Sequence, residues 1–244
     1  MEVSTEPAAN PGYLAFHRPR FDFVLRLVEA AIKGEVTLPR ARILDIGPSP
    51  LTDMLRSRLD VPVDTLGLEP ERNTGAGTHF RFDLNDAQER DRWRRDVGPY
   101  DVIVFAEVIE HLYTAPELVL DYLASLLSPG GVLLLQTPNA VSLRKRVKLA
   151  FGRNPFEPIR VSRSNPGHFR EYTLAELAGL LSRAGFRIRR HWIRFYFDAR
   201  YARHHTGHEA PRALRGLVSN AIYRLLPPSL REGITIIAER ERQG

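Results

Sequence analysis

Three ionisable residues near the middle of the chain have the types and spacing needed for proton transfer. Glu107, Glu110 and His111 stand at positions i, i+3 and i+4, which share one face of a helix. A histidine ionises near neutral pH and can act as a general base, with a carboxylate to assist it. We therefore expect His111 and Glu107 to be catalytic, although the same Glu-His pair could simply orient the turn that carries it.

The same residues could instead bind a divalent metal ion. Carboxylate and imidazole groups ligate ions such as Mg²⁺ and Mn²⁺. His168, in the sequence Gly-His-Phe-Arg, could supply a further ligand from a later loop. The candidate metal ligands are then Glu107, Glu110, His111 and His168, and this metal site is an alternative to a simple general base.

A group of three histidines, His204, His205 and His208, also looks like a metal cluster at first sight. Only one carboxylate, Glu209, stands nearby, and the segment contains Arg and Gly residues. Such a composition is typical of a solvated surface loop, so we expect no metal there.

Acidic residues also follow successive predicted strands. Asp45, Glu69, Asp83 and Glu107 stand at the ends of strands predicted at residues 42–46, 64–68, 79–82 and 100–105. The carboxyl ends of parallel strands meet at one edge of a sheet, where ligands bind. An acid after each of the first two strands suits a nucleoside, because Glu69 can accept hydrogen bonds from both ribose hydroxyls. Asp83 can then accept a hydrogen bond from an exocyclic amine of the base.

Helices and strands alternate along the chain, which predicts a mostly parallel sheet covered on both faces. Apolar residues three and four apart predict a first helix over residues 16–33, ended by Gly34. A capping box of Thr173 and Glu176 begins a later helix. The helices after the first are predicted at residues 52–59, 116–127, 142–151, 173–184 and 211–226. The remaining strands are predicted at residues 132–136, 186–197 and 233–240, with a turn at 128–131.

Five short motifs, in order along the chain, resemble those of class I S-adenosylmethionine-dependent methyltransferases. They are residues 43–47 (ILDIG), 66–70 (LGLEP), 82–85 (FDLN), 100–112 (YDVIVFAEVIEHL) and 127–135 (LSPGGVLLL). The Glu-Val-Ile-Glu-His string is common in the small-molecule branch of this family. The resemblance spans residues 16–186. It implies an α/β, Rossmann-like, seven-stranded and mostly parallel sheet with helices on both faces, in a single domain over residues 1–244.

The resemblance implies S-adenosylmethionine as the cofactor. Asp45 and Gly47 would border its methionine moiety, Glu69 would hold the ribose, and Asp83 with Leu84 would hold the adenine. Residues 105–107 would line the sulfonium. The full set of expected cofactor residues is Asp45, Gly47, Ser49, Glu69, Asp83, Leu84, Phe105 and Ala106.

The first motif departs from the family pattern in one respect. Pro48, Ser49 and Pro50 stand where the family usually has a second glycine. Ser49 is small enough to let a cofactor approach, but the prolines supply no N–H. Before the first strand, where the family often closes a lid, Tyr13, His17 and Arg20 are candidates for substrate contact or for plain packing.

The resemblance implies methylation of a small molecule, with an oxygen nucleophile on a sugar or lipid-linked intermediate as the acceptor we consider first. The string Thr137-Pro-Asn139, followed by His168, also resembles the metal-dependent RNA 2′-O-methyltransferases and some quinone-precursor O-methyltransferases. A metal-dependent RNA 2′-O-methyltransferase is therefore the first alternative. A non-catalytic binding subunit with the same fold is the second.

The chain of 244 residues has a net charge of +6, and much of the excess is arginine. Basic helical insertions near residues 142–168 and 200–230 could meet phosphate groups or an anionic membrane, or could be solvated surface helices. Nucleic acid is the less favoured partner. The location we expect is the cytoplasm, with peripheral contact to the inner face of the membrane left open.

The composition excludes several classes of chemistry. There are no cysteines, so disulfides, zinc–thiolate sites, iron–sulfur clusters and cysteine nucleophiles are excluded. No apolar run approaches the roughly 20 residues of a membrane span, and Met1–Asn10 lacks the apolar core of a secretory signal.

Overall fold

The computed structural model describes residues 11–35, 41–162, 166–201 and 213–241. The strands are β1 (Ile43–Ile46), β2 (Val63–Gly67), β3 (Arg72–Thr74), β4 (Gly77–Arg81), β5 (Tyr100–Ala106), β6 (Leu127–Pro138), β7 (Phe186–Arg194) and β8 (Gly233–Arg240). The α-helices are α1 (Pro11–Glu35), α2 (Pro50–Leu59), α3 (Pro116–Leu126), α4 (Leu143–Ala150), α5 (Leu174–Arg183) and α6 (Ala213–Leu225). Short 3₁₀ helices include η1 (Leu84–Gln88), η3 (Ile109–His111), η4 (Ala199–Tyr201) and η6 (Pro228–Leu230).

All the strands form one sheet in the order β3-β4-β2-β1-β5-β6-β8-β7. The pairs from β4 to β6 are parallel, whereas β8 runs antiparallel between β6 and β7. The expectation of a mostly parallel α/β sheet is confirmed, and the last strand has its predicted bounds. The sheet has eight strands rather than the predicted seven, because the short exposed strand β3 adds an antiparallel edge. Its polar residues give no apolar alternation from which it could be predicted.

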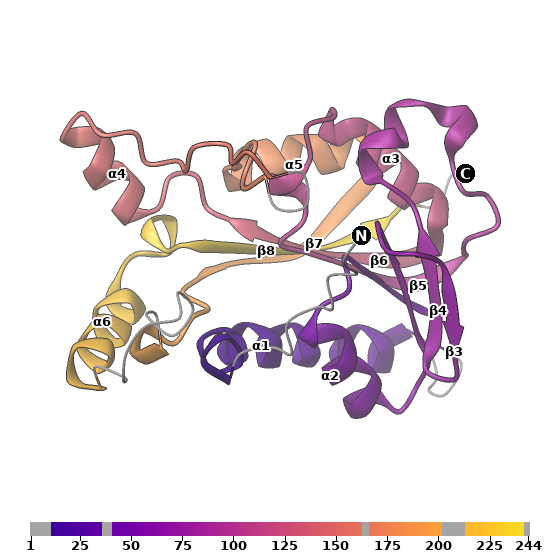
Figure 1. Cartoon of the computed structure of the whole chain (residues 1–244), viewed down its shortest axis with the longest axis horizontal. Helices are drawn as coiled ribbons and strands as arrows, with labels where there is room; N and C mark the ends of the chain where they lie inside the picture. Colours follow the sequence, from indigo (N-terminus) through magenta and orange to yellow (C-terminus); the bar gives the residue numbers. More distant parts are fainter. Residues whose placement is uncertain (1–10, 36–40, 163–165, 202–212, 242–244) are drawn as a thin grey trace.

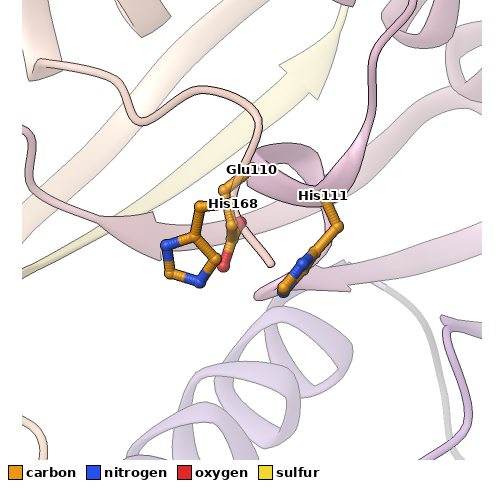
Figure 2. Close-up of side chains that lie close together, drawn as sticks. All are labelled: Glu110, His111 and His168. Carbon is orange, nitrogen blue, oxygen red and sulfur yellow. The ribbon is translucent and has the colours of Figure 1, made fainter. Parts of the chain in front are cut away.

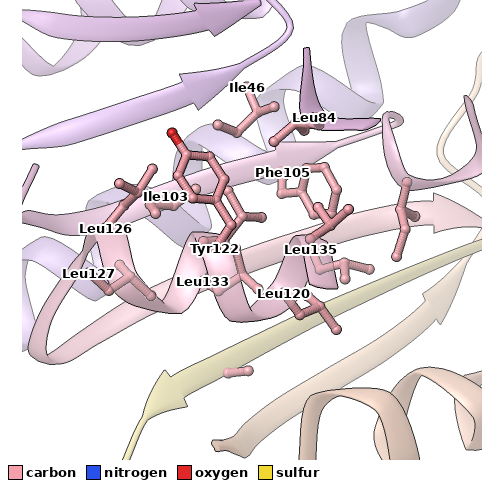
Figure 3. Close-up of a cluster of buried hydrophobic side chains, with 14 of the residues drawn as sticks. Ile46, Leu84, Ile103, Phe105, Leu120, Tyr122, Leu126, Leu127, Leu133 and Leu135 are labelled. Atoms are coloured by element: carbon pink, nitrogen blue, oxygen red, sulfur yellow. The ribbon is translucent and has the colours of Figure 1, made fainter. Parts of the chain in front are cut away.

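Helices cover both faces of the sheet, α1 and α2 on one side and α3 and α5 on the other (Figure 1). Successive residues of β5 enter opposite cores: Val102 and Val104 pack with α1 and α2, whereas Ile103 and Phe105 pack with α3. Figure 3 shows the second of these clusters, between the sheet and α3. Burial on both faces explains why the central strands read as continuous apolar runs.

Most element boundaries lie within two residues of prediction, and the larger differences are in α1, β6 and β7, which ends at Arg194 rather than at residue 197. Helix α1 begins at Pro11 rather than at Phe16, with Pro19 inside it, and continues past Gly34 to Glu35. The predicted turn at 128–131 is instead part of β6, because the β5–β6 register shifts there and absorbs the additional residues. Gly131 permits this close approach, since a Cβ on it would lie 2.9 Å from the carbonyl oxygens of both Ser128 and Tyr100.

Helix α5 begins with the predicted capping box. The Glu176 N–H donates to Thr173 Oγ1 (3.2 Å), and the Thr173 N–H donates to Glu176 Oε2 (2.8 Å). Both bonds satisfy backbone donors that the helix cannot satisfy itself. No helix in the described part of the chain is long and apolar enough to cross a membrane.

The capping box gives a direct test of local stability. We expect Thr173→Ala to lower the free energy of unfolding by about 1 kcal/mol, because the N-terminus of α5 loses its side-chain acceptor. Thr173→Ser keeps the hydroxyl and should lose less than half of that. Urea unfolding followed by circular dichroism measures both, and equal losses in the two variants would contradict the capping role.

Candidate active site

The turn between β1 and α2 is built around a helix cap. Gly47 has φ +72°, and its N–H donates to the Leu66 carbonyl at 2.9 Å. Ser49 is the N-cap of α2: its Oγ accepts from the Leu51 N–H, and its own N–H donates to Thr52 Oγ1. The two prolines therefore flank a residue that caps the helix, which explains how the segment turns without a second glycine.

Asp45 lies beneath this turn and is only 2% exposed. Its Oδ2 accepts a hydrogen bond from Thr52 Oγ1 at 2.6 Å. Burial raises the pKa of Asp45 to about 7, while the Thr52 hydrogen bond and the charges of Arg56 and Arg20 oppose that rise. Asp45 thus contacts the first turn of α2, and its expected contact with the methionine moiety stays a prediction.

Glu69 and Asp83 follow β2 and β4 at the same edge of the sheet. Glu69 Oε2 is buried, lies 3.6 Å from His79 Nε2, and accepts no hydrogen bond from any described residue. Both hydrogen bonds that Asp83 accepts within the described residues end on Oδ1, from the Asn85 N–H and the Asn85 side-chain amide. The Glu69 side chain is otherwise 44% exposed, and Asp83 Oδ2 accepts no hydrogen bond within the described residues. The expected ribose and adenine contacts stay predictions.

The apolar members of the expected cofactor set lie deeper. Leu84 is 4% exposed and Phe105 is fully buried, and both belong to the core cluster on the α3 side of the sheet (Figure 3). Ala106, at the end of β5, is half-buried. The Phe105 side chain packs in the core, so only its backbone could reach the sulfonium.

Glu107, the next residue, has an unusual backbone conformation. Its φ of +59° lies in the left-handed region that residues other than glycine rarely adopt. The Glu107 N–H donates to the Gln136 carbonyl at 2.8 Å, which holds the turn in place. Backbone strain of this kind clusters at functional sites, where the surrounding structure maintains it.

The predicted helical face of Glu107, Glu110 and His111 is not formed, because Glu107 precedes the short helix η3 that carries the other two. Instead, Glu110 and His111 converge with His168, which comes from the loop before α5 (Figure 2). One ligand atom from each of these three residues lies within 4.8 Å of the others. Glu107 is not in this group. The segment with His204, His205 and His208, where we expect a solvated loop, lies outside the described residues, as does Met1–Asn10.

Both histidines are held through their Nδ1 atoms. His111 Nδ1 lies 2.9 Å from the Gly167 carbonyl oxygen, and His168 Nδ1 lies 3.0 Å from Glu171 Oε1. A carbonyl or a carboxylate can only accept, so each Nδ1 carries a proton, and the Nε2 of a neutral ring then keeps its lone pair. Burial, together with the neighbouring His111, lowers the pKa of His168 to about 4, which keeps this ring neutral at pH 7.

Glu110 is fully buried between these rings and the sheet. Its Oε2 accepts from Thr137 Oγ1 at 2.9 Å, and its Oε1 has no hydrogen-bond partner among the described residues. Burial raises the pKa of Glu110 well above its ordinary value, and the charge of Glu107 raises it further. A buried carboxylate oxygen without a hydrogen-bond partner is costly, and burial favours the protonated form of Glu110.

A cavity of about 630 Å³ opens above this group. Its lining includes Glu107, Glu110, His111 and His168, so all four proposed catalytic or metal-binding residues face one space. The opposite wall comes from α1 and contains Tyr13, His17 and Arg20, the candidates for substrate contact or for plain packing. The third wall comes from α4, which contributes Arg144, Lys145 and Lys148.

Three residues support the site through contacts that the sequence did not indicate. Thr137 donates to Glu110, Glu171 accepts from His168, and Lys145 forms an ion pair with Glu171. Thr137 and Glu171 stand in or beside segments that the motifs include. Their roles depend on which side chains meet across the fold, which spacing along the chain does not give.

Comparison with known proteins assigns the chain to a family. A family described as a methyltransferase domain matches residues 15–191. The chain belongs to this family. The predicted resemblance to class I S-adenosylmethionine-dependent methyltransferases is therefore confirmed.

Curated relatives agree with this assignment. A Mycolicibacterium smegmatis protein named probable S-adenosylmethionine-dependent methyltransferase is 32% identical over 131 residues, 53% of this chain and 46% of that protein. A ubiquinone biosynthesis O-methyltransferase of Xanthomonas campestris is 32% identical over 114 residues, 44% of this chain and 47% of that enzyme. The chain thus spans about half the length of these relatives.

Solved structures show the same fold at low sequence identity. An S-adenosylmethionine-dependent methyltransferase from Mesorhizobium loti matches with a TM-score of 0.53 and 17% identity, over 89% of this chain and 96% of that one. The N-methyltransferase NodS of Bradyrhizobium japonicum, in complex with S-adenosyl-L-homocysteine, matches with a TM-score of 0.50 and 14% identity, over 96% and 90% of the two chains.

The buried Asp45 carboxyl makes the stability of the protein depend on pH. Its pKa rises from an ordinary 3.8 to about 7 on folding, so the folded state binds the proton more tightly and loses stability as pH rises through this range. We expect Asp45→Asn to remove this loss. The stability of the variant relative to the wild type should therefore be greater at about pH 8 than at about pH 5. Thermal unfolding at both pH values measures the difference.

Asp53, an 83% exposed carboxylate on the neighbouring helix α2, gives the matched control. Asp53→Asn should change stability equally at both pH values. If Asp45→Asn behaves in the same way, the assigned pKa of Asp45 is wrong.

Proposed function

We propose that this protein transfers the methyl group of S-adenosylmethionine to a hydroxyl of a small molecule, and that a divalent cation held by Glu110, His111 and His168 assists the transfer. The observation that carries the proposal is the convergence of three ligand atoms within 4.8 Å at the base of one cavity. Family membership and the relatives named as O-methyltransferases support the same reaction.

The hydrogen bonds around the histidines favour metal binding over an isolated base. Histidines that ligate metals usually donate their second N–H to a carbonyl or a carboxylate, which fixes the tautomer and the direction of the lone pair. His111 and His168 do this through Gly167 and Glu171. A divalent cation would favour the ionised form of Glu110, whose carboxylate would complete the ligand group.

The proposed reaction is a direct displacement. The acceptor oxygen attacks the methyl carbon, the bond from carbon to sulfur breaks, S-adenosylhomocysteine leaves, and the acceptor loses its proton. A bound divalent cation would make the acceptor hydroxyl more acidic. Glu107 lines the cavity but stands outside the ligand group, so we assign it the role of accepting the proton. His111 then acts as a ligand rather than as the general base.

The cofactor half of the site follows from the other carboxylates. We assign Glu69 to the ribose hydroxyls and Asp83, with Leu84, to the adenine, because the partly exposed Glu69 and the unpaired Asp83 Oδ2 stand at the edge where ligands bind. Gly47 and Ser49 form the turn beside the methionine moiety. A small hydroxylated acceptor suits the cavity, whose α1 wall includes the aromatic rings of Tyr13 and Phe16.

The cofactor assignment predicts specific losses of affinity. Glu69→Ala and Asp83→Ala should each weaken binding of S-adenosylhomocysteine by on the order of tenfold or more, because each removes hydrogen bonds to the ligand. Isothermal titration calorimetry measures this. Glu71→Gln, which removes an exposed carboxylate two residues after Glu69, should leave the affinity unchanged, and an equal loss in that variant would contradict the ribose assignment.

The metal assignment predicts that Mn²⁺ binds through Glu110, His111 and His168. His168→Ala and Glu110→Gln should abolish calorimetric binding of Mn²⁺, and Glu171→Gln should weaken it about tenfold by releasing the His168 ring. His191→Ala is the matched control, because that exposed histidine lies on β7, outside the cavity. Binding that persists in His168→Ala would contradict the assignment.

Activity gives the second arm of this test. Methyl transfer from labelled S-adenosylmethionine to a panel of catechols, hydroxylated sugars and short RNAs should favour a small molecule and should stop on addition of a chelator. A rate indifferent to chelator would leave His111 and Glu107 as a metal-free acid–base pair. Transfer to RNA alone would overturn the small-molecule acceptor.

A further inference from the structure

Helix α6 turns its apolar side to solvent. Leu214, Leu217, Val218, Ile222 and Leu225 recur at helical spacing along one stripe, and each is between 51% and 85% exposed. In a helix that only covers a core, such a stripe would face inward. The exposed stripe of α6 is therefore available to a partner.

The other side of α6 is the side that packs. A Cβ on Gly216 would collide with the backbone of η4, so the helix lies directly against it. The Asn220 amide donates to Asp198 at 3.0 Å, and the Tyr223 ring stacks on Phe195 at 4.3 Å. These contacts are specific, and they fix the orientation that exposes the stripe.

Helix α4 and the segment after it also expose apolar side chains. None of the residues of α4, all of which the structure describes, is buried. Val147, Leu149 and Phe151 are 46%, 56% and 78% exposed, and Ile159 and Val161 follow on the surface. Twelve of the fourteen exposed large apolar side chains in the described part of the chain lie in residues 141–161 and 214–225. We call these two segments together the α4–α6 surface.

The two segments lie at the same end of the molecule, opposite β3 and β4 (Figure 1). Hydrogen bonds join the residue that precedes the α4 segment to the connection that follows α6. The Asn139 side chain, just before α4, donates to the Ser229 and Arg231 carbonyls in the connection that follows α6, and the Asn139 N–H donates to the Glu232 carbonyl. The two helices therefore leave the sheet from adjacent points.

The apolar side chains are interspersed with cations. Residues 142–162 contain six Lys and Arg residues and one acidic residue, Glu157. Helix α6 adds Arg215 and Arg224 and has no acidic residue. Exposed apolar side chains beside a net positive charge are the combination that binds the headgroup region of an anionic bilayer.

We propose that the α4–α6 surface docks on an anionic lipid bilayer, with its apolar side chains inserted among the headgroups and its cations against lipid phosphates. Charge argues against a second copy of this chain as the occupant, because a symmetric contact would bring two strongly basic surfaces together. The apolar side chains also project from separate helices rather than lining a groove for a peptide.

Docking would place the mouth of the acceptor cavity at the membrane. Lys145 and Lys148 of α4 line that cavity, while Val147 and Leu149 are exposed on the same helix. This consequence rests on the proposed function, because it assumes that the cavity binds the acceptor. The docking of the α4–α6 surface on a bilayer does not depend on the proposed function.

Vesicle flotation tests the proposal on the whole chain. The wild type should float with vesicles of phosphatidylglycerol and phosphatidylcholine in equal amounts, and should stay unbound with phosphatidylcholine alone. The double variant Leu217→Ser/Ile222→Ser should bind on the order of tenfold or more weakly. Arg146→Gln/Arg153→Gln should lose about fivefold per cation removed.

Two matched variants control for apolar area and for charge. Leu68→Ser removes an exposed leucine outside the surface, and Arg90→Gln/Arg92→Gln removes two exposed cations outside it. Both should bind vesicles like the wild type. Equal binding by all variants, or a dimer in sedimentation velocity that Leu217→Ser/Ile222→Ser abolishes, would overturn the proposal.

The experiment separates this inference from the proposed function. Calorimetric binding of S-adenosylhomocysteine should be unchanged in Leu217→Ser/Ile222→Ser, since the cofactor residues follow other strands. Loss of flotation with retained cofactor binding supports the docking surface. Retained cofactor binding in a wild type that does not float with anionic vesicles refutes docking and leaves the proposed function intact.

Discussion

The candidate site depends on the backbone contacts that fasten the loop before α5 to η3. The Glu110 carbonyl accepts from the Phe169 and Arg170 N–H groups, at 2.8 Å and 3.3 Å, and the Gly167 carbonyl accepts from His111. These contacts bring His168 next to His111, although the two stand some 57 residues apart in the sequence. The pairing of Asn139 with Tyr172 fixes the far end of the same loop against the end of β6.

Buried carboxyl groups meet a buried cation, Arg20, at this edge of the sheet. Arg20 on α1 is 5% exposed, and its charge lowers the pKa of both Asp45 and Glu110, against the larger effect of their burial. Helix α1 thus does more than cover the sheet, because its guanidinium links the two halves of the site. Groups held in costly environments are typical of positions that function maintains at the expense of stability.

Much of the fold could be predicted because the central strands are buried on both faces. Burial produces continuous apolar runs that end in polar residues, and these runs also carry the family motifs. β3 could not be predicted because it is short, polar and exposed. The left-handed conformation of Glu107, the convergence of His168 and the outward stripe of α6 could not be predicted either. Each depends on contacts between distant segments, whereas spacing along the chain reports only local periodicity.

The division of the site among connections has an evolutionary consequence. The expected cofactor residues follow β1, β2, β4 and β5, whereas α4 and α6 belong to the connections after β6 and β7. These later connections can change in length and composition without altering the register of any parallel pair. Changes in α4 and α6 could therefore alter the proposed acceptor cavity, while the strand ends expected to hold the methyl donor stay as they are.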